Sequence, residues 1–491
     1  MGIVVAIDAG TTGVRAFAVD ERGRPLGYAY REFPQYFPRP GWVEHDAGEI
    51  WDAVRATCAE LTARLDQPVA AVGITDQRET TVVWDRRTGR PLHRAIVWQD
   101  RRTAGHCRRL EAAGHLPLIR DRTGLVLDPY FSATKLAWLL DEGGVEASPD
   151  LAFGTVDTWI LWNLTGGTVF ATDPSNASRT LLYDIRGLGW SEELAALFGV
   201  PLAGLAEVRP SSGRLGLTVD GCGLPAGVPV SGLAGDQQAA LFGQACFAPG
   251  DTKSTYGTGG FVLMNVGDAC PDPVPGLLTT VAWQLDGQRG ATYALEGAVF
   301  VMGAAVQWLR DGLGIITTAG ESEALAASIE GNDGVYLVPA FTGLGSPEWD
   351  PDARGTIVGL TRGTGRAHLA RAALEAMAYA TRDVVETMSA TSGYPITRLR
   401  ADGGASANGL LLRLQADQLG VPVTRPLVPE TTALGAAYLA GLAEGVWSDL
   451  EEVASYWRAD LVAEPPASRG RPDADHAGWR RAVERSLGWA R

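Results

Sequence analysis

Two short turns rich in glycine and threonine, each flanked by β-forming residues, constrain the fold of this chain most strongly. The first spans residues 8–13 (DAGTTG) and the second residues 254–260 (STYGTGG). Residues 3–7, before the first turn, are apolar and mostly β-branched, which is typical of a buried strand. Each turn is therefore expected to close a β-hairpin. The recurrence predicts an α/β chain of two similar halves, residues 1–248 and 249–491, with a boundary near residue 248.

Length, charge and cysteine usage exclude several classes of protein. A chain of 491 residues suggests at least two domains. The net charge of −15 and the lack of a long basic run argue against nucleic acid as a partner. No apolar run approaches membrane-spanning length, and the chain opens on a strand-like segment rather than a signal peptide. The five cysteines are scattered and form no CxxC pair, so we expect the protein to be located in the reducing cytoplasm.

The two turns point to phosphate chemistry of an unusual kind. Phosphoryl transfer needs polar groups around the phosphates, a divalent ion and a carboxylate that orients or deprotonates the nucleophile. The only lysines are Lys135 and Lys253, and neither follows the GxxxxG of a P-loop. The motifs of protein kinases are also missing. Backbone N–H groups and hydroxyls in the two turns are thus expected to grip a triphosphate between the halves.

A second group of residues suits a hydroxylated substrate. Asp236 lies in a Gly-Asp-Gln-Gln run at the expected start of a helix. A strand over 69–74 leads to Arg78 and Glu79, and an expected hairpin of residues 82–84 and 95–98 ends at Trp98. Ligands of open α/β sheets usually bind at such strand ends. Taken singly, Arg78 and Glu79 could also form a surface ion pair, and Trp98 could be a core aromatic. Asp236 could be a helix N-cap.

The ordered set of loops resembles the actin-like (ribonuclease H-like) ATPases, in which two α/β domains surround a central cleft. Asp402-Gly403-Gly404, after a late strand, would be the adenosine loop. Five longer segments, in order along the chain, are similar to the FGGY carbohydrate kinases and among them to members that phosphorylate glycerol. These segments are ITDQRET (74–80), IVWQDRRT (96–103), DPYFSATK (128–135), TDPSNASRT (172–180) and AGDQQAALFGQ (234–244).

The resemblance implies a polyol-binding N-terminal domain, a nucleotide-binding C-terminal domain and a role for each matching residue. Asp236 would be the general base, so that ATP phosphorylates glycerol to sn-glycerol 3-phosphate in glycerol catabolism. Asp8 would hold Mg²⁺ through water. The substrate would contact the side chains of Arg78, Glu79, Trp98, Tyr130, Asp236, Gln237 and Phe261. ATP would contact Thr11, Thr12, Arg15, Thr258, Gly259, Gly303, Gln307, Gly404 and Asn408. A dimer or tetramer of identical chains is expected as well.

Departures from the family pattern leave alternatives open. Asp76 replaces the usual Asn and is expected to place an extra carboxylate beside Arg78, which could alter substrate preference. Gly227 stands where some members carry the Arg of a fructose-1,6-bisphosphate site, so we do not expect that inhibition. The alternatives are an FGGY kinase for another polyol or a ketose, such as erythritol or xylulose, and a non-metabolic actin-like ATPase. A glycosidase using Asp8 and Asp236 would leave the glycine-rich turns unexplained.

Overall fold

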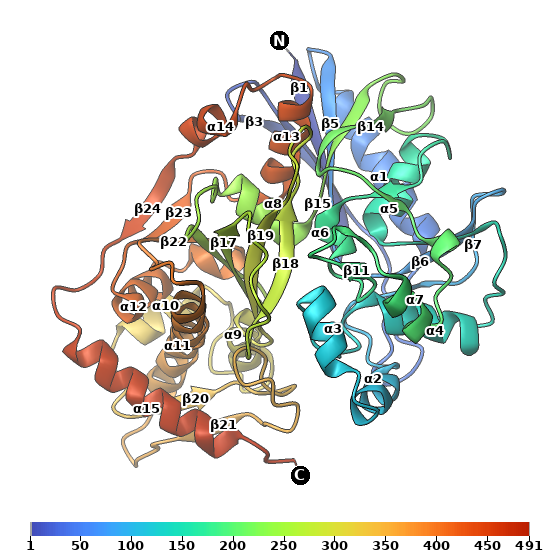
Figure 1. Cartoon of the computed structure of the whole chain (residues 1–491). Helices are drawn as coiled ribbons and strands as arrows, with labels where there is room; N and C mark the ends of the chain where they lie inside the picture. The colour runs from blue at the N-terminus through green and yellow to red at the C-terminus, as the bar shows by residue number, and fades with distance from the viewer. Residues whose placement is uncertain (1, 491) are drawn as a thin grey trace.

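The computed structural model describes residues 2–490, and its elements gather around two mixed β-sheets that form two lobes (Figure 1). In the first sheet β1 pairs antiparallel with β2 and parallel with β5, and β15 pairs parallel with β5. The carboxyl ends of β1, β5 and β15 therefore meet at one edge. In spatial order the strands are β14 (Ser212–Leu217), β15 (Pro229–Gly235), β5 (Val69–Asp76), β1 (Ile3–Ala9), β2 (Gly13–Val19) and β3 (Pro25–Glu32).

The second sheet repeats this logic, because β16 pairs antiparallel with β17 and parallel with β22. Thr255 faces Asp402 in the parallel pair, so the segments that follow these two residues leave the sheet at the same edge. In spatial order the strands are β18 (Leu278–Trp283), β19 (Thr292–Val299), β17 (Gly260–Gly267), β16 (Thr252–Tyr256), β22 (Leu399–Asp402), β23 (Val423–Pro426) and β24 (Ala459–Ala463).

Short sheets extend the lobes. In one of them β6 (Val82–Asp85) pairs with both β7 (Arg90–Pro91) and β9 (Leu151–Gly154). The others pair β4 (Glu44–His45) with β8 (Ala95–Ile96), β10 (Ala171–Thr172) with β13 (Glu207–Val208), β11 (Tyr183–Asp184) with β12 (Gly189–Trp190), and β20 (Tyr336–Val338) with β21 (Thr356–Val358). The expected hairpin of 82–84 with 95–98 forms only in part. Thr81 and Ile96 form an isolated antiparallel bridge, but β6 turns back early to pair with β7, where Asp85 pairs with Arg90, and β8 pairs with β4.

Helices cover both sheets, and none of those within residues 2–490 is both long and apolar enough to cross a membrane. Up to residue 243 they are α1 (Ala47–Thr62), α2 (Ala104–Ala112), α3 (Leu116–Thr123), α4 (Ser132–Asp141), α5 (Val156–Leu164), α6 (Pro174–Ala177), α7 (Glu192–Phe198) and α8 (Asp236–Gly243). The later helices are α9 (Gly303–Asp311), α10 (Glu321–Ala327), α11 (Arg366–Ser392), α12 (Gly409–Leu419), α13 (Thr431–Ala443), α14 (Leu450–Tyr456) and α15 (Gly470–Ser486).

Helices α8 and α13 cross with almost no space between their backbones. A Cβ atom added to Gly435 would lie 1.8 Å from the carbonyl oxygen of Ala239, and one added to Gly243 would lie 2.0 Å from that of Thr431. Helix α13 also lies against the first sheet, where a Cβ on Gly73 would lie 2.1 Å from the carbonyl oxygen of Ala436. In Figure 1 α13 stands beside β1 and β5, between the two lobes.

We predict that Gly435→Ala destabilises the chain strongly, because its methyl group would overlap a backbone oxygen that cannot rotate away. Overpacking of this kind costs about 1–3 kcal/mol or more. The midpoint of urea unfolding, followed by tryptophan fluorescence, measures the loss. Gly105→Ala is the matched control: it lies in α2, its nearest neighbours are the ends of Arg side chains at 3.7 and 3.9 Å, and its midpoint should not fall. Equal midpoints for the two variants would contradict the prediction.

Candidate active site

Two carboxylates predicted to act in the reaction lie at the shared edge of the first sheet. Asp8 is the penultimate residue of β1 and lies beside Thr75 of β5, and Asp236 opens α8 directly after β15. Burial raises the pKa of Asp8 to about 6, the positive charge of Arg15 opposes this, and the negative charge of Asp236 adds to it. Asp236 Oδ1 accepts a hydrogen bond from the backbone N–H of Gln237, at 2.7 Å. Its side chain is 33% exposed, so a small ligand can reach it.

Arg78 is the centre of the polar contacts in the site. Its Nε lies 3.2 Å from Asp236 Oδ1. Its Nη1 and Nη2 donate to the two oxygens of Glu296, at 2.6 and 3.1 Å. The remaining hydrogens point to Gln238 Oε1, at 3.2 Å from Nη1, and to the hydroxyl of Tyr130, at 3.3 Å from Nη2. Every N–H of the guanidinium thus has a nearby acceptor.

Glu79 belongs to a buried cluster of alternating charges. Its Oε1 accepts from Arg179 Nε at 2.7 Å, and Arg179 Nη2 donates to Glu296 Oε1 at 2.9 Å. The side chains of Glu79, Arg179 and Glu296 are at most 1% exposed. Burial alone would raise the pKa of Glu296, but the two arginines more than offset this and hold it at about 2. We did not predict Arg179 or Glu296, although Arg179 lies inside one of the family-like segments.

The predicted aromatic residues line the same place. Trp98 and Tyr130 meet edge to face, with ring centroids 5.6 Å apart. The indole of Trp98 also donates to Thr11 Oγ1 at 2.9 Å, which ties the aromatic pair to the first glycine-rich turn. Phe261 comes from β17 of the second sheet, and its ring centroid lies 5.7 Å from the guanidinium carbon of Arg78. The structure therefore brings these residues together, although they are distant in sequence.

Gln237 faces the second lobe instead of Arg78. Its Oε1 accepts a hydrogen bond from Lys253, whose ammonium also donates to Thr255 Oγ1 at 2.7 Å. Thr255 in turn donates to Asp402, the first residue of the predicted adenosine loop. Burial lowers the pKa of Lys253, and the charge of Asp402 opposes that shift. A polar chain thus links the substrate residues to the second sheet.

The second lysine supports the aromatic residues. Lys135 is fully buried, and its ammonium donates to the backbone carbonyls of Tyr130 and Phe131. Burial lowers the pKa of Lys135 to about 8. Both lysines of the chain are therefore enclosed next to predicted site residues, and neither is on the surface.

The first glycine-rich turn is partly open to solvent. Thr12 is exposed, with its hydroxyl 3.5 Å from that of Tyr30. Arg15 lies opposite Asp8 in the β1–β2 ladder and is half-buried. Its guanidinium is 3.8 Å from Glu430, at the start of α13. The turn and Arg15 therefore present donors at the edge where Asp8 lies.

The second turn is joined to the start of α9. The carbonyl of Gly257 accepts from the N–H of Gly303, and that of Thr258 accepts from the N–H of Ala304. A Cβ on Gly259 would lie 2.9 Å from the carbonyl oxygen of Val299, so the backbone approaches closely here. Thr258 is exposed, as is Gln307 one helical turn beyond Gly303.

The predicted adenosine loop lies against Tyr256, the last residue of β16. Gly403 has a φ of 82°, and a Cβ there would meet the backbone of Tyr256 at 2.7 Å. Gly404 is exposed and begins a short 3₁₀ turn, Gly404–Ala407. Asn408 Oδ1 caps α12 by accepting from the N–H of Leu411 at 3.0 Å. Its carbonyl oxygen is therefore engaged, and its amide nitrogen is the group left for a ligand.

Asp76 does not act as we expected. Its carboxyl accepts from the backbone N–H of Asp157 at 3.1 Å, whereas the contacts of Arg78 are with other groups. The side chain is fully buried, and its Oδ1 has no partner among the described residues. Burial, aided by the charge of Asp157, raises the pKa of Asp76 well above its usual range. The expectation of an extra carboxylate beside Arg78 was wrong, because β5 directs this side chain toward α5.

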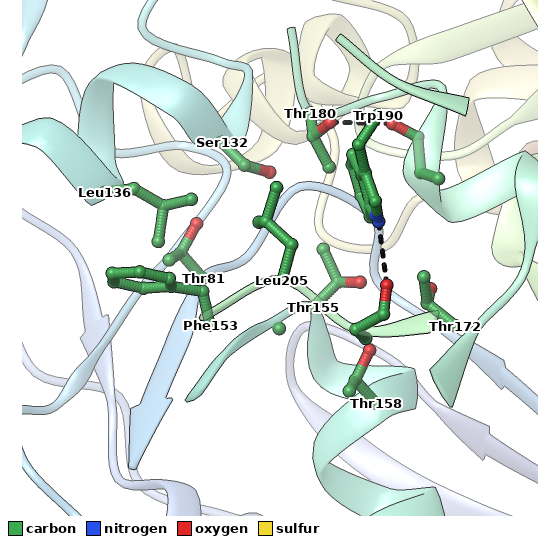
Figure 2. Close-up of a pocket in the computed structure, with 13 residues that line it drawn as sticks. Thr81, Ser132, Leu136, Phe153, Thr155, Thr158, Thr172, Thr180, Trp190 and Leu205 are labelled. Carbon is green, nitrogen blue, oxygen red and sulfur yellow. Dashed lines mark hydrogen bonds between the residues drawn. The ribbon is translucent and has the colours of Figure 1, made fainter. Parts of the chain in front are cut away.

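The first lobe contains a cavity of about 20 Å³, which is lined by Thr81 and Ser132 among others. Figure 2 shows hydroxyl groups, among them those of Ser132 and Thr158, together with the ring of Phe153 around it. Ser132 Oγ donates to the backbone carbonyl of Glu79 at 3.1 Å. The cavity has room for about one water molecule. None of the predicted site residues lines it, so it is separate from the substrate contacts.

Comparison with known proteins assigns the family. A model of the N-terminal domain of the FGGY family of carbohydrate kinases matches residues 3–243, and a model of the C-terminal domain matches residues 252–444. The chain belongs to the FGGY family of carbohydrate kinases. Glycerol kinase of Bordetella parapertussis is 54% identical over 497 aligned residues, and that of Dechloromonas aromatica is 56% identical over 495. Both alignments cover 99% of this chain and 98% of the relative.

Solved structures of FGGY kinases share this fold. The crystal structure of Plasmodium falciparum glycerol kinase with ADP has a TM-score of 0.93 and 34% identity, and covers 99% of this chain and 98% of its own. The ligand-bound xylulose kinase of Lactobacillus acidophilus has a TM-score of 0.89 at 23% identity, with 99% of each chain covered. The expected class, a two-domain α/β fold of the actin-like ATPase type, is confirmed.

We predict that Asp76→Asn stabilises the chain more at pH 8 than at pH 5. The folded state holds a proton on Asp76 over a pH range in which the unfolded carboxyl has lost it. Stability is therefore lost as pH rises from the ordinary carboxyl pKa through the raised one. Asn keeps an oxygen for the N–H of Asp157 and has no proton to release.

Thermal unfolding midpoints of both proteins at the two pH values measure the effect. Asp66→Asn, at an exposed position, controls for the removal of one negative charge. A difference between Asp76→Asn and the unaltered chain that is the same at both pH values would contradict the prediction.

Proposed function

We propose that this chain transfers the γ-phosphoryl group of ATP to a terminal hydroxyl of glycerol, forming sn-glycerol 3-phosphate and ADP. The observation that carries the proposal is the cluster of Arg78, Tyr130, Trp98 and Asp236, because it combines hydrogen-bonding groups with aromatic faces at one strand edge. A triol offers little apolar surface, so paired hydrogen bonds must select it. Relatives named glycerol kinase, aligned over nearly the whole chain, support this substrate.

Asp236 is proposed as the general base. Its Oδ1 is held by the N–H of Gln237 and by Arg78, while no hydrogen-bond partner for Oδ2 is seen among residues 2–490. Oδ2 takes the proton of the attacking hydroxyl as the hydroxyl oxygen bonds to the γ-phosphorus and ADP leaves. Glu79 accepts from a second substrate hydroxyl and Arg78 donates to one. Trp98 and Phe261 pack on the carbon chain.

The nucleotide is proposed to lie between the two glycine-rich turns. Thr11, Thr12, Arg15, Thr258 and Gly259 would surround the phosphates, and the contacts of the remaining nucleotide would come from Gly303, Gln307, Gly404 and Asn408. The boundary at residue 248 would then separate a polyol-binding domain from a nucleotide-binding one. Closure of the two over their ligands would exclude water and align the hydroxyl with the γ-phosphate.

Asp8 fits a magnesium ion. Mg²⁺ prefers oxygen ligands and is usually held by one or two carboxylates together with water and substrate phosphates. What supports this site is the position of Asp8 at the edge of the first sheet, directly before the first glycine-rich turn. The described residues contain no group of three or more potential metal ligands, so water and phosphate oxygens would complete the coordination. A bound Mg²⁺ would neutralise charge on the phosphates. We also propose a cytoplasmic location and a homo-oligomer, as expected from the sequence.

We predict that Asp236→Asn lowers turnover by about two to four orders of magnitude, the usual scale of general acid–base help. ADP release in the presence of glycerol measures it. Asp46→Asn is the matched control, because Asp46 also accepts from backbone N–H groups at a helix start, that of α1, and Asn retains the cap. Near-normal turnover of Asp236→Asn would remove this residue from the mechanism.

A substrate panel tests the function itself. ADP release by the unaltered chain is measured in the presence of glycerol, of erythritol, of xylulose and without added substrate, and the four rates are compared. The proposal expects the largest stimulation with glycerol. Stronger stimulation by another polyol or a ketose would show that the chain is an FGGY kinase with a different substrate. ATP hydrolysis that no polyol stimulates would favour the actin-like ATPase alternative.

A further inference from the structure

We propose that Glu296 is a specificity-determining residue: by occupying both terminal nitrogens of Arg78, it prevents the substrate site from binding carboxylates and restricts it to uncharged polyols. The proposal deepens the proposed function and depends on Arg78 being a substrate residue. Glu296 lies on β19 of the second sheet, 218 positions after Arg78. It is outside the residue set implied by the family resemblance.

The argument begins with the geometry of the guanidinium. An arginine that binds a carboxylate tightly does so through two parallel N–H bonds. At Arg78 this pair is already formed with Glu296, at 2.6 and 3.1 Å, and Glu296 is fully buried. An incoming carboxylate would have to displace a buried carboxylate that two arginines hold in place. The remaining contacts of Arg78 are longer and single: 3.2 Å from Nη1 to Gln238, 3.3 Å from Nη2 to Tyr130 and 3.2 Å from Nε to Asp236.

Single, long contacts suit a hydroxyl group. A hydroxyl oxygen needs one donor, and it can return its own proton to an acceptor nearby. Exchanging the 3.3 Å bond to Tyr130 for a bond to substrate leaves the pair with Glu296 intact. A carboxylate gains little from one such bond, because it must still shed its hydration. Arg78 is thus left as a donor of single bonds.

Charge leads to the same conclusion. Arg78 and Arg179 carry two positive charges, and Glu79 and Glu296 carry two negative ones, so the cluster is neutral. Asp236 adds a negative charge 3.2 Å from Arg78 Nε. A small anion therefore meets no excess of positive charge among these five residues. Replacing Glu296 by Gln would remove one negative charge and turn one of its two acceptor oxygens into an amide donor, so at least one N–H of Arg78 or Arg179 would lose its acceptor.

The test compares glycerol with glycerate, in which a carboxylate replaces one terminal CH₂OH. Binding of each is measured by titration calorimetry, so that the result does not depend on turnover. Glycerate should bind the unaltered chain more weakly than glycerol by at least about tenfold, the lower range for a lost hydrogen bond to a charged group. In Glu296→Gln the ratio should shift toward glycerate by about ten- to a hundredfold, through a freed N–H and a lost negative charge.

Two further variants keep the test decisive. Glu375→Gln is the matched control, because Glu375 is also a buried carboxylate bonded to an arginine, Arg371, but on α11. Its glycerate-to-glycerol ratio should equal that of the unaltered chain. Glu296→Asp retains the negative charge on a shorter side chain, so glycerol binding should weaken while glycerate stays rejected. It also serves if Glu296→Gln does not fold.

Three outcomes would overturn the inference. These are equal binding of glycerol and glycerate by the unaltered chain, an unchanged ratio in Glu296→Gln, or a shift in Glu375→Gln as large as that in Glu296→Gln. The substrate panel distinguishes these failures from failure of the proposed function. A chain that releases ADP with glycerol but shows an unchanged ratio in Glu296→Gln retains the function and loses only this role for Glu296.

Discussion

The close crossing of α8 and α13 is the contact on which the site depends. Asp236 is the first residue of α8, so its place is set by how deeply that helix sits against its neighbours. Gly243 and Gly435 allow backbone-to-backbone approach there, and no other residue type fits without displacing a carbonyl group. Because α13 lies late in the sequence and also packs on β1 and β5, it ties this late segment to the first strands of the chain. A shift at this crossing would move the proposed base away from both glycine-rich turns.

The second constraint is the enclosure of charge. Removing ionised groups from water is costly, and a buried pair is maintained only when geometry and further hydrogen bonds compensate. Arg78, Glu79, Arg179 and Glu296 meet this condition by sharing partners, although Arg179 Nη1 has no hydrogen-bond partner among the described residues. This desolvation cost is expected at a site that must hold its hydrogen-bonding groups rigid for a small, flexible substrate. Clusters of this kind contribute more to orientation than to stability.

Local pattern was sufficient for the two glycine-rich hairpins, one in each lobe, but not for the pairing of residues 82–84 with 95–98. The hairpins around residues 8–13 and 254–260 could be predicted because β-branched runs and glycine-rich turns act over a few residues. The partners of Arg78 could not be predicted in this way. Glu296 lies on the second sheet, and only the packing of the two lobes brings it to Arg78. The direction of Asp76 was missed for the same reason: α5 lies far along the chain. The residue roles and the domain boundary remain predictions.

The two buried lysines have a practical consequence. Among 42 lysine and arginine residues only Lys135 and Lys253 carry a side-chain amine, and both are enclosed in the fold. The lysine and arginine side chains at the surface are therefore all guanidinium groups, which do not react with ordinary acylating reagents. Amine-directed dyes and crosslinkers would find no lysine to modify while the chain is folded. The same reagents would gain two sites as it unfolds, so their incorporation would report opening of the regions around the proposed site.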